Sequence, residues 1–365
     1  MKDIIIVGGG ASGVCAAIEL KKLNNDLKVL ILEQNDKILK KLLKTGNGKC
    51  NISNSNIIKD KYNDFSLIEA NINNVDINKY FLDLGLVLKE TDLNRMYPYS
   101  ENSGSVVNVL LEAIKKNNIE VITNYKVESL RKEKDYFIIN DSEKAKYVIM
   151  ATGSCAQEKT NGYELIKKLG IKVSKLQPGL VNLETKESTS ALKGLRVKCK
   201  TVINNLDYYG ELLFKDNGLS GIISFDISRV VKNNDVVSFD LAPEFTEEQL
   251  YQLLNSNNLD IVLNGLFPKM VSFDLLKRSN RELDKLIKEI KNYKFNIKGK
   301  GSFDNAQIAL GGVCVSELKT NFEVKKIDNL YISGELIDVD GASGGYNLFF
   351  AWLSGIVAAR SIVNK

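Results

Sequence analysis

Short apolar runs alternate with helix-like patterns over the first third of the chain. Residues 4–7, IIIV, end at a run of glycines, and apolar residues from Val14 to Leu20 then recur at the spacing of one helix face. A second apolar run, KVLILE, covers residues 28–33. The order strand, glycine turn, helix, strand predicts a βαβ unit and therefore a parallel sheet.

The same alternation continues further along the chain. The pattern is mainly helical over residues 76–117, whereas apolar runs at 119–123 and 147–153 predict strands with a small hairpin or meander between them. Residues 162–170 predict a helix that is closed by Gly170. These elements extend the βαβ unit into a larger α/β domain.

The pattern changes at Pro178. Short strands broken by glycine and asparagine run to about residue 243 and predict a small, barrel-like β unit. Residues 246–249, TEEQ, form a capping-box signature, and helical patterns follow to about Tyr293. The strand and glycine pattern returns near residue 306 and leads to a final helix. The predicted α/β domain covers residues 1–178 and 305–365. The predicted β-rich insert covers residues 179–243, and the helical part of the insert covers residues 244–304.

Composition narrows the chemistry. The 365 residues are 44% hydrophobic and 26% charged, and the net charge of +5 is spread along the chain, which favours a globular protein over a dedicated nucleic-acid binder. There is no histidine, which excludes a histidine-based triad, a histidine metal site and a histidyl–flavin bond. The five cysteines are scattered without a CxxC pair, and the N-terminal apolar run is too short for a signal peptide. We therefore expect reduced thiols, no metal site and a cytoplasmic protein.

The first glycine turn, GGGASG, carries the G-x-G-x-x-G pattern at Gly8, Gly10 and Gly13. In dinucleotide-binding folds the first glycine allows a tight turn, the second lets a pyrophosphate approach the backbone, and the third lets helix and strand pack closely. The start of the following helix offers N–H groups to the phosphates. Glu33, at the end of the next strand, is placed to accept hydrogen bonds from a ribose diol. The alternative is a turn that only joins strand to helix.

Two later segments favour FAD over NAD as the tightly bound cofactor. Residues 147–153, YVIMATG, resemble the motif that lies beside FAD in the glutathione-reductase-like flavoproteins. Residues 330–341, LYISGELIDVDG, resemble the second FAD motif of those proteins, with Glu335 in place of the usual aspartate. The resemblance implies a discontinuous, Rossmann-type FAD domain. We expect FAD to be bound without a covalent link, because the chain has no histidine and no pattern marks any of the five cysteines as an attachment site. NADH or NADPH would serve as a transient electron donor.

Three segments restrict the resemblance to one family of flavoproteins. They are residues 41–54 (KLLKTGNGKCNISN), 309–318 (ALGGVCVSEL) and 334–360 (GELIDVDGASGGYNLFFAWLSGIVAAR). Together they resemble the flavoprotein family that includes BaiN-type bile-acid-inducible reductases, aminoacetone oxidase and YhiN-like proteins. The turn after Ala-Thr-Gly, residues 154–165, is shorter than is usual in that family, and so is the insert. The substrate of any one member therefore does not follow from the resemblance.

In that family the loop after the glutamate-bearing strand follows the extended FAD. The resemblance implies that Gly46 and Gly48 let backbone N–H groups reach phosphate, ribitol or flavin oxygens. Lys40 or Lys41 would neutralise the pyrophosphate or flank the adenosine ribose, and Asn51 and Asn54 would satisfy either flavin edge groups or only the backbone of their own loop. The full set of residues that the resemblance places beside FAD is Gly8, Gly10, Ala11, Ser12, Gly13, Glu33, Gln34, Lys40, Lys41, Gly46, Gly48, Cys50, Asn51, Val127, Ala151, Thr152, Gly153, Gly334, Glu335, Asp338, Gly344, Gly345, Tyr346, Asn347 and Leu348.

The resemblance also predicts a role for the last helix in binding FAD. Residues 348–359, LFFAWLSGIVAA, have the length of a buried helix rather than of a membrane span. In the resembling flavoproteins the start of this helix faces the N1 and C2-carbonyl edge of the flavin, where its positive end would stabilise the reduced, anionic form. Gly344 and Gly345 would let the ring approach closely. Tyr346 would either line the active site or pack as a hydrogen-bonded aromatic. Cys50 is expected to be a buried thiol rather than a catalytic one.

The resemblance implies an FAD-dependent oxidoreductase that passes hydride through flavin N5. Our first expectation is an NAD(P)H-linked reductase of an activated C=C bond in a small or sterol-like substrate. The lack of a second G-x-G-x-x-G slightly favours the alternative of an oxidase that takes hydride from a small amine and produces hydrogen peroxide. An alternative of another class is a flavin-dependent nucleic-acid-modifying or redox-sensing binding protein. The expected partner is a small-molecule substrate, with no nucleic acid and no membrane, and the expected assembly is a monomer or homodimer.

Overall fold

The computed structural model describes residues 1–255 and 258–365, which form two compact units. Unit 1 contains Met1–Gln177 and Ile308–Lys365, and unit 2 contains Pro178–Gln307. Unit 2 is thus an insertion between two segments of unit 1, which confirms the predicted discontinuous α/β architecture. The boundaries between the two units fall after residues 177 and 307, whereas the sequence pattern predicted them after residues 178 and 304.

Unit 1 is built on a seven-stranded sheet with the order β6-β2-β1-β9-β8-β7, in which β18 also pairs with β9. Strands β6, β2, β1, β9 and β18 are parallel, and β8 and β7 form an antiparallel edge. The strand bounds are β1 Lys2–Val7, β2 Val29–Leu32, β6 Glu120–Ile122, β7 Leu130–Lys132, β8 Phe137–Ile139, β9 Glu143–Met150 and β18 Leu330–Ile332. The strands and the hairpin predicted for this domain are therefore confirmed.

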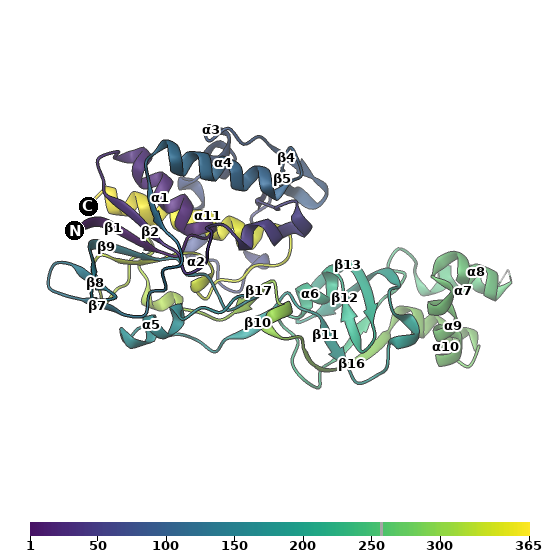
Figure 1. Cartoon of the computed structure of the whole chain (residues 1–365). Coiled ribbons are helices and arrows are strands. Elements are labelled where there is room, and N and C mark those ends of the chain that lie inside the picture. Colours follow the sequence, from purple (N-terminus) through teal and green to yellow (C-terminus); the bar gives the residue numbers. More distant parts are fainter. Residues whose placement is uncertain (256–257) are drawn as a thin grey trace. The chain divides into compact units, whose positions relative to one another are not determined.

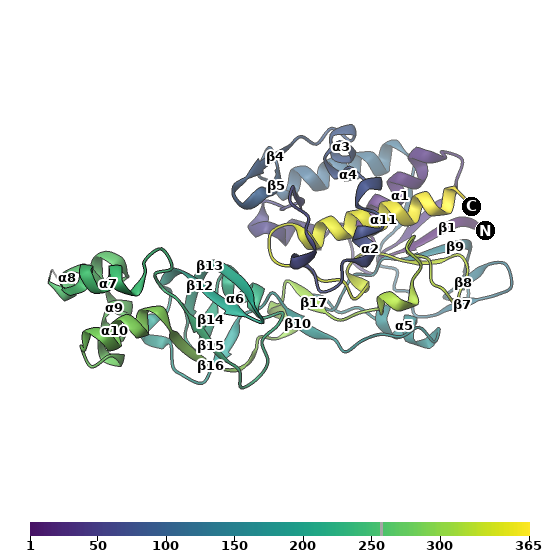
Figure 2. The ribbon, with the colours of Figure 1, turned by 180° about the vertical axis from the view of Figure 1, so that it is seen from behind.

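Helices cover the sheet of unit 1. The second parts of β1 and β9, residues 4–7 and 147–150, are continuous apolar runs because both faces of the sheet are buried there, and Ile5, Val148 and Ile149 have no exposed surface. Helices α1 (Ala11–Leu23) and α11 (Tyr346–Val363) lie side by side (Figures 1 and 2). The remaining helices of the unit are α2 Ser66–Glu69, α3 Ile77–Asp83, α4 Ser103–Lys116, α5 Gly162–Lys168 and the 3₁₀ helix η1 Lys41–Gly48.

Helix α11 is the core helix that the sequence predicted. Among the described residues it alone is long and apolar enough to cross a membrane, but 72% of it is buried inside the protein. Trp352, in its middle, is fully buried, and its indole N–H donates a hydrogen bond of 3.0 Å to the carbonyl of Ile52. This bond ties α11 to the loop that contains the motif TGNGKCN.

Residues 76–117 are not one helical region, and the prediction is wrong for the middle of that range. After α3, β4 (Leu88–Thr91) and β5 (Arg95–Pro98) form a hairpin that pairs with β3 (Ser53–Asn54). The turn of the hairpin has left-handed backbone at Leu93 and Asn94, which a helix does not contain. Pairing with β3, far earlier in the chain, supplies backbone hydrogen bonds that a local helical pattern cannot reveal.

Unit 2 is a six-stranded antiparallel sheet with the order β12-β13-β14-β11-β16-β15. Its two ends meet, because the backbones of Lys200 and Asp240 exchange hydrogen bonds of 2.9 and 2.8 Å, and the sheet is therefore nearly closed. This confirms the predicted barrel-like character. The strand bounds are β11 Leu183–Thr185, β12 Arg196–Ile203, β13 Leu206–Lys215, β14 Gly218–Ser220, β15 Val236–Phe239 and β16 Tyr293–Lys300. A separate two-stranded sheet consists of β10 Gln177–Gly179 and β17 Ile308–Leu310.

Helices follow β15, as predicted. The capping box is present, because Thr246 Oγ1 accepts a hydrogen bond of 3.2 Å from the N–H of Gln249, and Gln249 Oε1 accepts one of 2.9 Å from the N–H of Thr246. The predicted helical part of the insert ends earlier than residue 304, since β16 returns to the sheet. The helix bounds in unit 2 are α6 Ile222–Ile227, α7 Glu247–Asn255, α8 Leu259–Leu266, α9 Lys269–Arg278 and α10 Leu283–Lys291.

Candidate functional site

The predicted cofactor motifs meet at the carboxyl ends of three neighbouring strands of unit 1. The N–H of Ala151, just after β9, donates a hydrogen bond of 2.8 Å to the carbonyl of Val7 at the end of β1. The N–H of Ser333, just after β18, donates one of 3.0 Å to the carbonyl of Met150. The glycine turn, the Ala-Thr-Gly segment and the second FAD motif therefore lie together. This edge of a parallel sheet is where α/β folds bind ligands.

The turn before α1 combines two tightly packed glycines with one that faces open space. A Cβ atom on Gly8 would lie 2.3 Å from the carbonyl oxygen of Ala151, and one on Gly13 would lie 2.1 Å from the carbonyl oxygen of Gly8. Gly10, the N-cap residue of α1, has no side-chain cap, and no atom of the described residues lies within 4 Å of its Cβ position. The turn therefore presents the start of α1 to an open space, as a pyrophosphate site requires.

Glu33 lies at the end of β2, as predicted, and only 7% of its surface is exposed. Its two carboxylate oxygens accept hydrogen bonds of 2.8 Å from the N–H groups of Gly9 and Asn35. These bonds fix the carboxylate beneath the glycine turn. Because an ionised carboxylate has about four acceptor positions, it can also accept from a ribose diol.

Lys41 and Glu335, which belong to different motifs, form an ion pair of 2.8 Å. The other carboxylate oxygen of Glu335 accepts a hydrogen bond of 3.1 Å from the N–H of Ala309. Lys40 is exposed and pairs with Asp36 at 3.1 Å instead. Of the two lysines that the sequence proposed as neighbours of the pyrophosphate, Lys41 is therefore the one that contacts another predicted site residue.

The second FAD motif is anchored by hydrogen bonds on both of its sides. The N–H of Gly334 donates a bond of 2.8 Å to the hydroxyl of Ser354 on α11. The carboxylate of Asp338 accepts bonds of 2.7 Å from the hydroxyl of Ser174 and 3.1 Å from the amide of Asn63. The side chain of Asp338 is thus already used in holding three segments of unit 1 together.

Gln34 and Val127 lie in loops next to the end of β2. The side-chain amide of Gln34 donates a hydrogen bond of 2.9 Å to the carbonyl of Lys159. The carbonyl of Val127, a buried residue, accepts one of 2.8 Å from the amide of Asn161. Both contacts reach the segment after Ala-Thr-Gly, and they fix that segment beside the Glu33 end of the predicted site.

The loop TGNGKCN follows a left-handed backbone path. Gly46, Asn47, Gly48 and Cys50 all have positive φ. A Cβ atom on Gly46 would lie 2.8 Å from the backbone nitrogen of Asn51, whereas no described atom lies within 4 Å of the Cβ position of Gly48. The loop therefore combines close backbone packing at its first glycine with an open surface at its second.

The two cysteines beside these motifs do not have the character of reactive thiolates. Cys50 is fully buried, and burial raises its pKa to about 11, against a smaller lowering by its hydrogen bond with Thr45. Burial also raises the pKa of Cys155. Both thiols stay protonated at neutral pH, and the buried position expected of Cys50 is confirmed.

Helix α11 begins at Gly345, beside the loop TGNGKCN. Gly345 has φ of 101°, and a Cβ atom there would lie 2.2 Å from the carbonyl oxygen of Ser53 and 3.0 Å from Oδ1 of Asn51. The preceding loop thus requires a glycine at this position by itself, and the close approach of a flavin ring to Gly345 stays a prediction. Asn54 strengthens the contact by donating a hydrogen bond of 3.1 Å to the carbonyl of Gly344.

Tyr346 and Asn347 brace the turn that leads into α11. The ring of Tyr346 is 6% exposed and packs edge-on against Tyr62, with centroids 5.6 Å apart, and the hydroxyl of Tyr62 donates to the carbonyl of Tyr346 at 2.9 Å. The amide of Asn347 binds both the N–H and the carbonyl of Gly341, each at 2.8 Å. Leu348 follows and is half-buried. These contacts favour a packed aromatic over a substrate-contacting one at Tyr346.

Two side chains of β5 lie near the predicted site residues but were not predicted from the sequence, because β5 was assigned to a helical region. The Nε atom of Arg95 lies 3.7 Å from the Cβ position of Gly344, and the ring of Tyr97 lies 3.5 Å from that of Gly46. The signal that could have found them is strand-like alternation, in which Met96 is buried and its two neighbours are half-buried.

Buried polar atoms without partners mark where a polar ligand fits. Asn51 Oδ1, Thr152 Oγ1 and Ser333 Oγ are buried and make no hydrogen bond within the described parts of the chain. Each belongs to a different predicted FAD motif, and a buried polar atom of this kind is costly unless a ligand or water satisfies it. The Cβ positions of Gly10 and Gly153, in the same motifs, face open space. The residues present therefore fit an extended, polar dinucleotide such as FAD.

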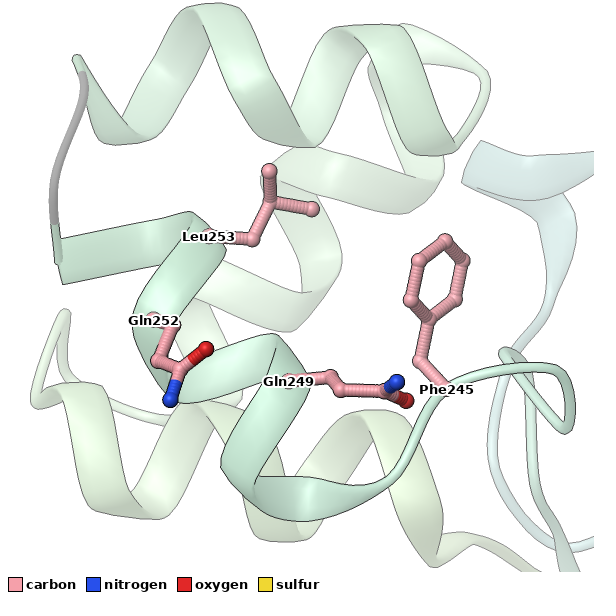
Figure 3. Close-up of a pocket in the computed structure, with 4 residues that line it drawn as sticks. All are labelled: Phe245, Gln249, Gln252 and Leu253. Carbon is pink, nitrogen blue, oxygen red and sulfur yellow. The ribbon is translucent and has the colours of Figure 1, made fainter.

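The surface hollow in Figure 3 belongs to unit 2. Its lining residues are Phe245, on the loop before α7, and Gln249, Gln252 and Leu253 on α7 itself. None of these side chains titrates, and none belongs to a predicted motif. The functional site is therefore assigned to the motif residues of unit 1.

Comparison with known proteins was consistent with this site. A family model described as the HI0933-like protein Rossmann domain matches residues 2–361. The chain is 31% identical to a Clostridium scindens protein named 3-dehydro-bile acid delta(4,6)-reductase, with 100% of both chains covered. It is 26% identical to a Haemophilus influenzae protein named ribosomal RNA dihydrouridine synthase, with 98% of both chains covered. A solved quinol–fumarate reductase matches with a TM-score of 0.53 and 13% identity, over 100% of this chain and 71% of that one, which shows a shared fold.

Proposed function

The chain belongs to the HI0933-like Rossmann family, and we propose that this FAD-dependent oxidoreductase reduces a C=C bond conjugated to a carbonyl group, with NADH or NADPH as the hydride donor. The membership confirms the family resemblance that residues 41–54, 309–318 and 334–360 indicated. The electron donor, the substrate class and the bond that is reduced are the new parts of the proposal.

One observation carries the proposal. The FAD motifs converge at one edge of the parallel sheet in a chain that aligns from end to end with a reductase. Read as chemistry, the names of both relatives describe the addition of two hydrogens to a C=C bond near a carbonyl. Such a bond is electrophilic at its β carbon and therefore suits hydride transfer. Neither name describes the oxidation of an amine, which was the alternative expectation.

The residues of the site would bind and orient the reactants. When bound, FAD supplies two-electron redox chemistry, so that NAD(P)H, one proton and C=C become NAD(P)⁺ and CH–CH. The turn at Gly10 would hold the pyrophosphate at the start of α1, and Glu33 would hold the adenosine ribose. Asn51 and the start of α11 would hold the flavin. Because the chain has no histidine, the proton on the α carbon must come from another side chain or from water.

The proposal is tested by anaerobic mixing of the purified holoprotein with NADH or NADPH in a stopped-flow spectrometer. We expect the oxidised flavin band to bleach, and to return when cyclohex-2-enone or a 3-keto-4-ene steroid is added. Absence of bleaching by either nicotinamide, together with bleaching by a small amine and hydrogen peroxide on admission of air, would contradict the proposal and support the oxidase.

The alignment with the Haemophilus influenzae protein favours a second candidate substrate of the same reaction class, a uridine in ribosomal RNA. The C5=C6 bond of uridine is conjugated to a carbonyl, so the same hydride chemistry applies. The net charge of +5 provides only weak general attraction to phosphates, which disfavours this candidate relative to a small enone. Incubation of the reduced holoprotein with unmodified ribosomal RNA, followed by mass spectrometry of the nucleosides, separates the two. Dihydrouridine formation would favour the RNA substrate.

A further inference from the structure

Arg95 occupies an unusual position at the start of α11. It lies in β5, directly opposite Asn54 in the ladder with β3, and its Nε atom lies 3.7 Å from the Cβ position of Gly344. Its side chain is half-buried. A guanidinium group is always charged in proteins and has five N–H donors, so a half-buried one is expected to face an acceptor.

No acceptor for Arg95 is present among the described residues. Its guanidinium group makes no hydrogen bond and no ion pair there. The other arginines behave differently, and Arg229 also has a partner. The arginines with an ion pair are Arg131, Arg196, Arg278, Arg281 and Arg360.

A second, independent observation points to a ligand at the same place. The side chain of Asn51 is only 9% exposed, and its Oδ1 has no hydrogen-bond partner in the described chain. That oxygen lies 3.0 Å from the Cβ position of Gly345, the N-cap residue of α11, which no side chain caps. An unpartnered amide, an unpaired cation and the positive end of an 18-residue helix thus converge on one spot.

We propose that Arg95 is a cofactor-tuning residue, which faces the pyrimidine edge of bound FAD and stabilises the negative charge that this edge gathers on two-electron reduction. The inference rests on the proposed function, because it requires FAD to bind with its flavin ring at the start of α11. A fixed positive charge at this edge favours the reduced form over the oxidised form and therefore raises the reduction potential.

The test is a potentiometric titration of the FAD-loaded full-length protein against a reference dye under anaerobic conditions. Arg95→Met removes the charge and keeps a long side chain. We expect it to weaken binding of reduced FAD about tenfold more than binding of oxidised FAD, which lowers the two-electron potential by about 30 mV. Arg95→Lys keeps the charge and should recover most of the shift.

A matched control separates a local from a general charge effect. Arg131→Met removes the same charge from β7, at the edge of the sheet, where Arg131 is paired with Asp141. This variant should keep the wild-type potential. If Arg95→Met does not yield folded holoprotein, Arg95→Gln, which also removes the charge but keeps hydrogen-bonding groups, decides the question in the same titration.

The outcomes distinguish this inference from the proposed function. A wild-type potential in Arg95→Met or Arg95→Gln overturns the assignment of Arg95, while the NAD(P)H and enone experiment with wild-type protein stands independently. Lost turnover with an unchanged potential would also overturn it, because Arg95 would then act on the substrate. A lower potential that Arg95→Lys does not restore would indicate loosened structure rather than lost charge, and would count against it as well.

Discussion

The starts of α1 and α11 differ in backbone and in side chains, because Gly10 is extended, with φ of −82°, whereas Gly345 is left-handed, with φ of 101°. Both helices begin at a glycine that has no side-chain cap, and the two helices lie side by side. At α1 the nearby charged group, Glu33, already accepts two backbone hydrogen bonds. At α11 the amide of Asn51 and the guanidinium group of Arg95 have no partner among the described residues.

This difference matches two different tasks. A pyrophosphate has a constant charge during a redox cycle, and backbone N–H groups at a helix start suffice to bind it. A flavin edge changes its charge, and side chains that are free to respond are useful there. In the function proposed above, the start of α1 only holds the cofactor, whereas the start of α11 also influences its chemistry.

The largest effect is expected from Gly13→Ala, which should disrupt the start of α1 itself. The new Cβ atom would lie 2.1 Å from the carbonyl oxygen of Gly8, so that helix and turn must move apart. We expect the free energy of unfolding of the apoprotein to fall by about 1–3 kcal/mol, as is typical of overpacking, and FAD binding to be lost. Urea unfolding measures the first and FAD titration the second. An apoprotein of unchanged stability that binds FAD normally would show that the packing is not tight.

The second-largest effect is expected from removal of the carboxylate of Glu33, near the start of α1. Glu33→Ala should weaken FAD binding by about 1.5–3 kcal/mol, the range for hydrogen bonds to a charged group, because both the ribose contact and the support of the glycine turn are lost. Glu33→Gln keeps the shape of the side chain without its charge, and its affinity for FAD should lie between those of the wild type and Glu33→Ala. FAD content after extensive dialysis is the measurement, and unchanged retention in Glu33→Ala would refute the ribose assignment.

Gly10→Ala is the sharper test of the open space at α1. Its Cβ atom would meet no described atom within 4 Å, and its φ of −82° is normal for alanine, so stability of the apoprotein should stay within about 0.5 kcal/mol. If a pyrophosphate lies there, the dissociation constant for FAD should rise about tenfold, or about 1.4 kcal/mol. Calorimetric titration of the apoprotein with FAD measures it. Equal affinity in Gly10→Ala and wild type would place the phosphates elsewhere.

The smallest effect concerns the thiol beside α11. Burial raises the pKa of Cys50 to about 11, so the thiol is protonated in the folded protein at neutral pH. The stability that this shift contributes is fully present below about pH 9, the pKa of an ordinary thiol, and is lost progressively as pH rises from about 9 to about 11. We expect iodoacetamide at pH 8 to leave Cys50 unmodified in the native holoprotein while it reaches the half-exposed Cys314. Peptide mapping by mass spectrometry decides this. Rapid modification of Cys50 would contradict this prediction, because it would show an accessible, reactive thiol near the start of α11.

The sequence was most informative at α1 and least informative at α11. The contact of Gly13 with Gly8 and the place of Glu33 depend on one continuous βαβ unit, whose periods are visible locally, whereas Gly8 also packs against Ala151 of the Ala-Thr-Gly segment. The environment of Gly345 depends on Ser53, and that of Gly344 on Arg95, which are far away in the chain. Because β5 is short and pairs with β3 far earlier in the chain, its residues were assigned to a mainly helical region and to no site. The motifs predict that the last helix lies beside the flavin, but they do not identify the side chains around its start.

The most direct test of the account is a crystal structure of the protein with FAD bound. We expect the pyrophosphate to lie over Gly10 at the start of α1 and a ribose hydroxyl to donate to Glu33. The pyrimidine edge of the flavin should lie against Asn51, Arg95 and the start of α11. A pyrophosphate away from Gly10, or a flavin ring directed away from the start of α11, would contradict it.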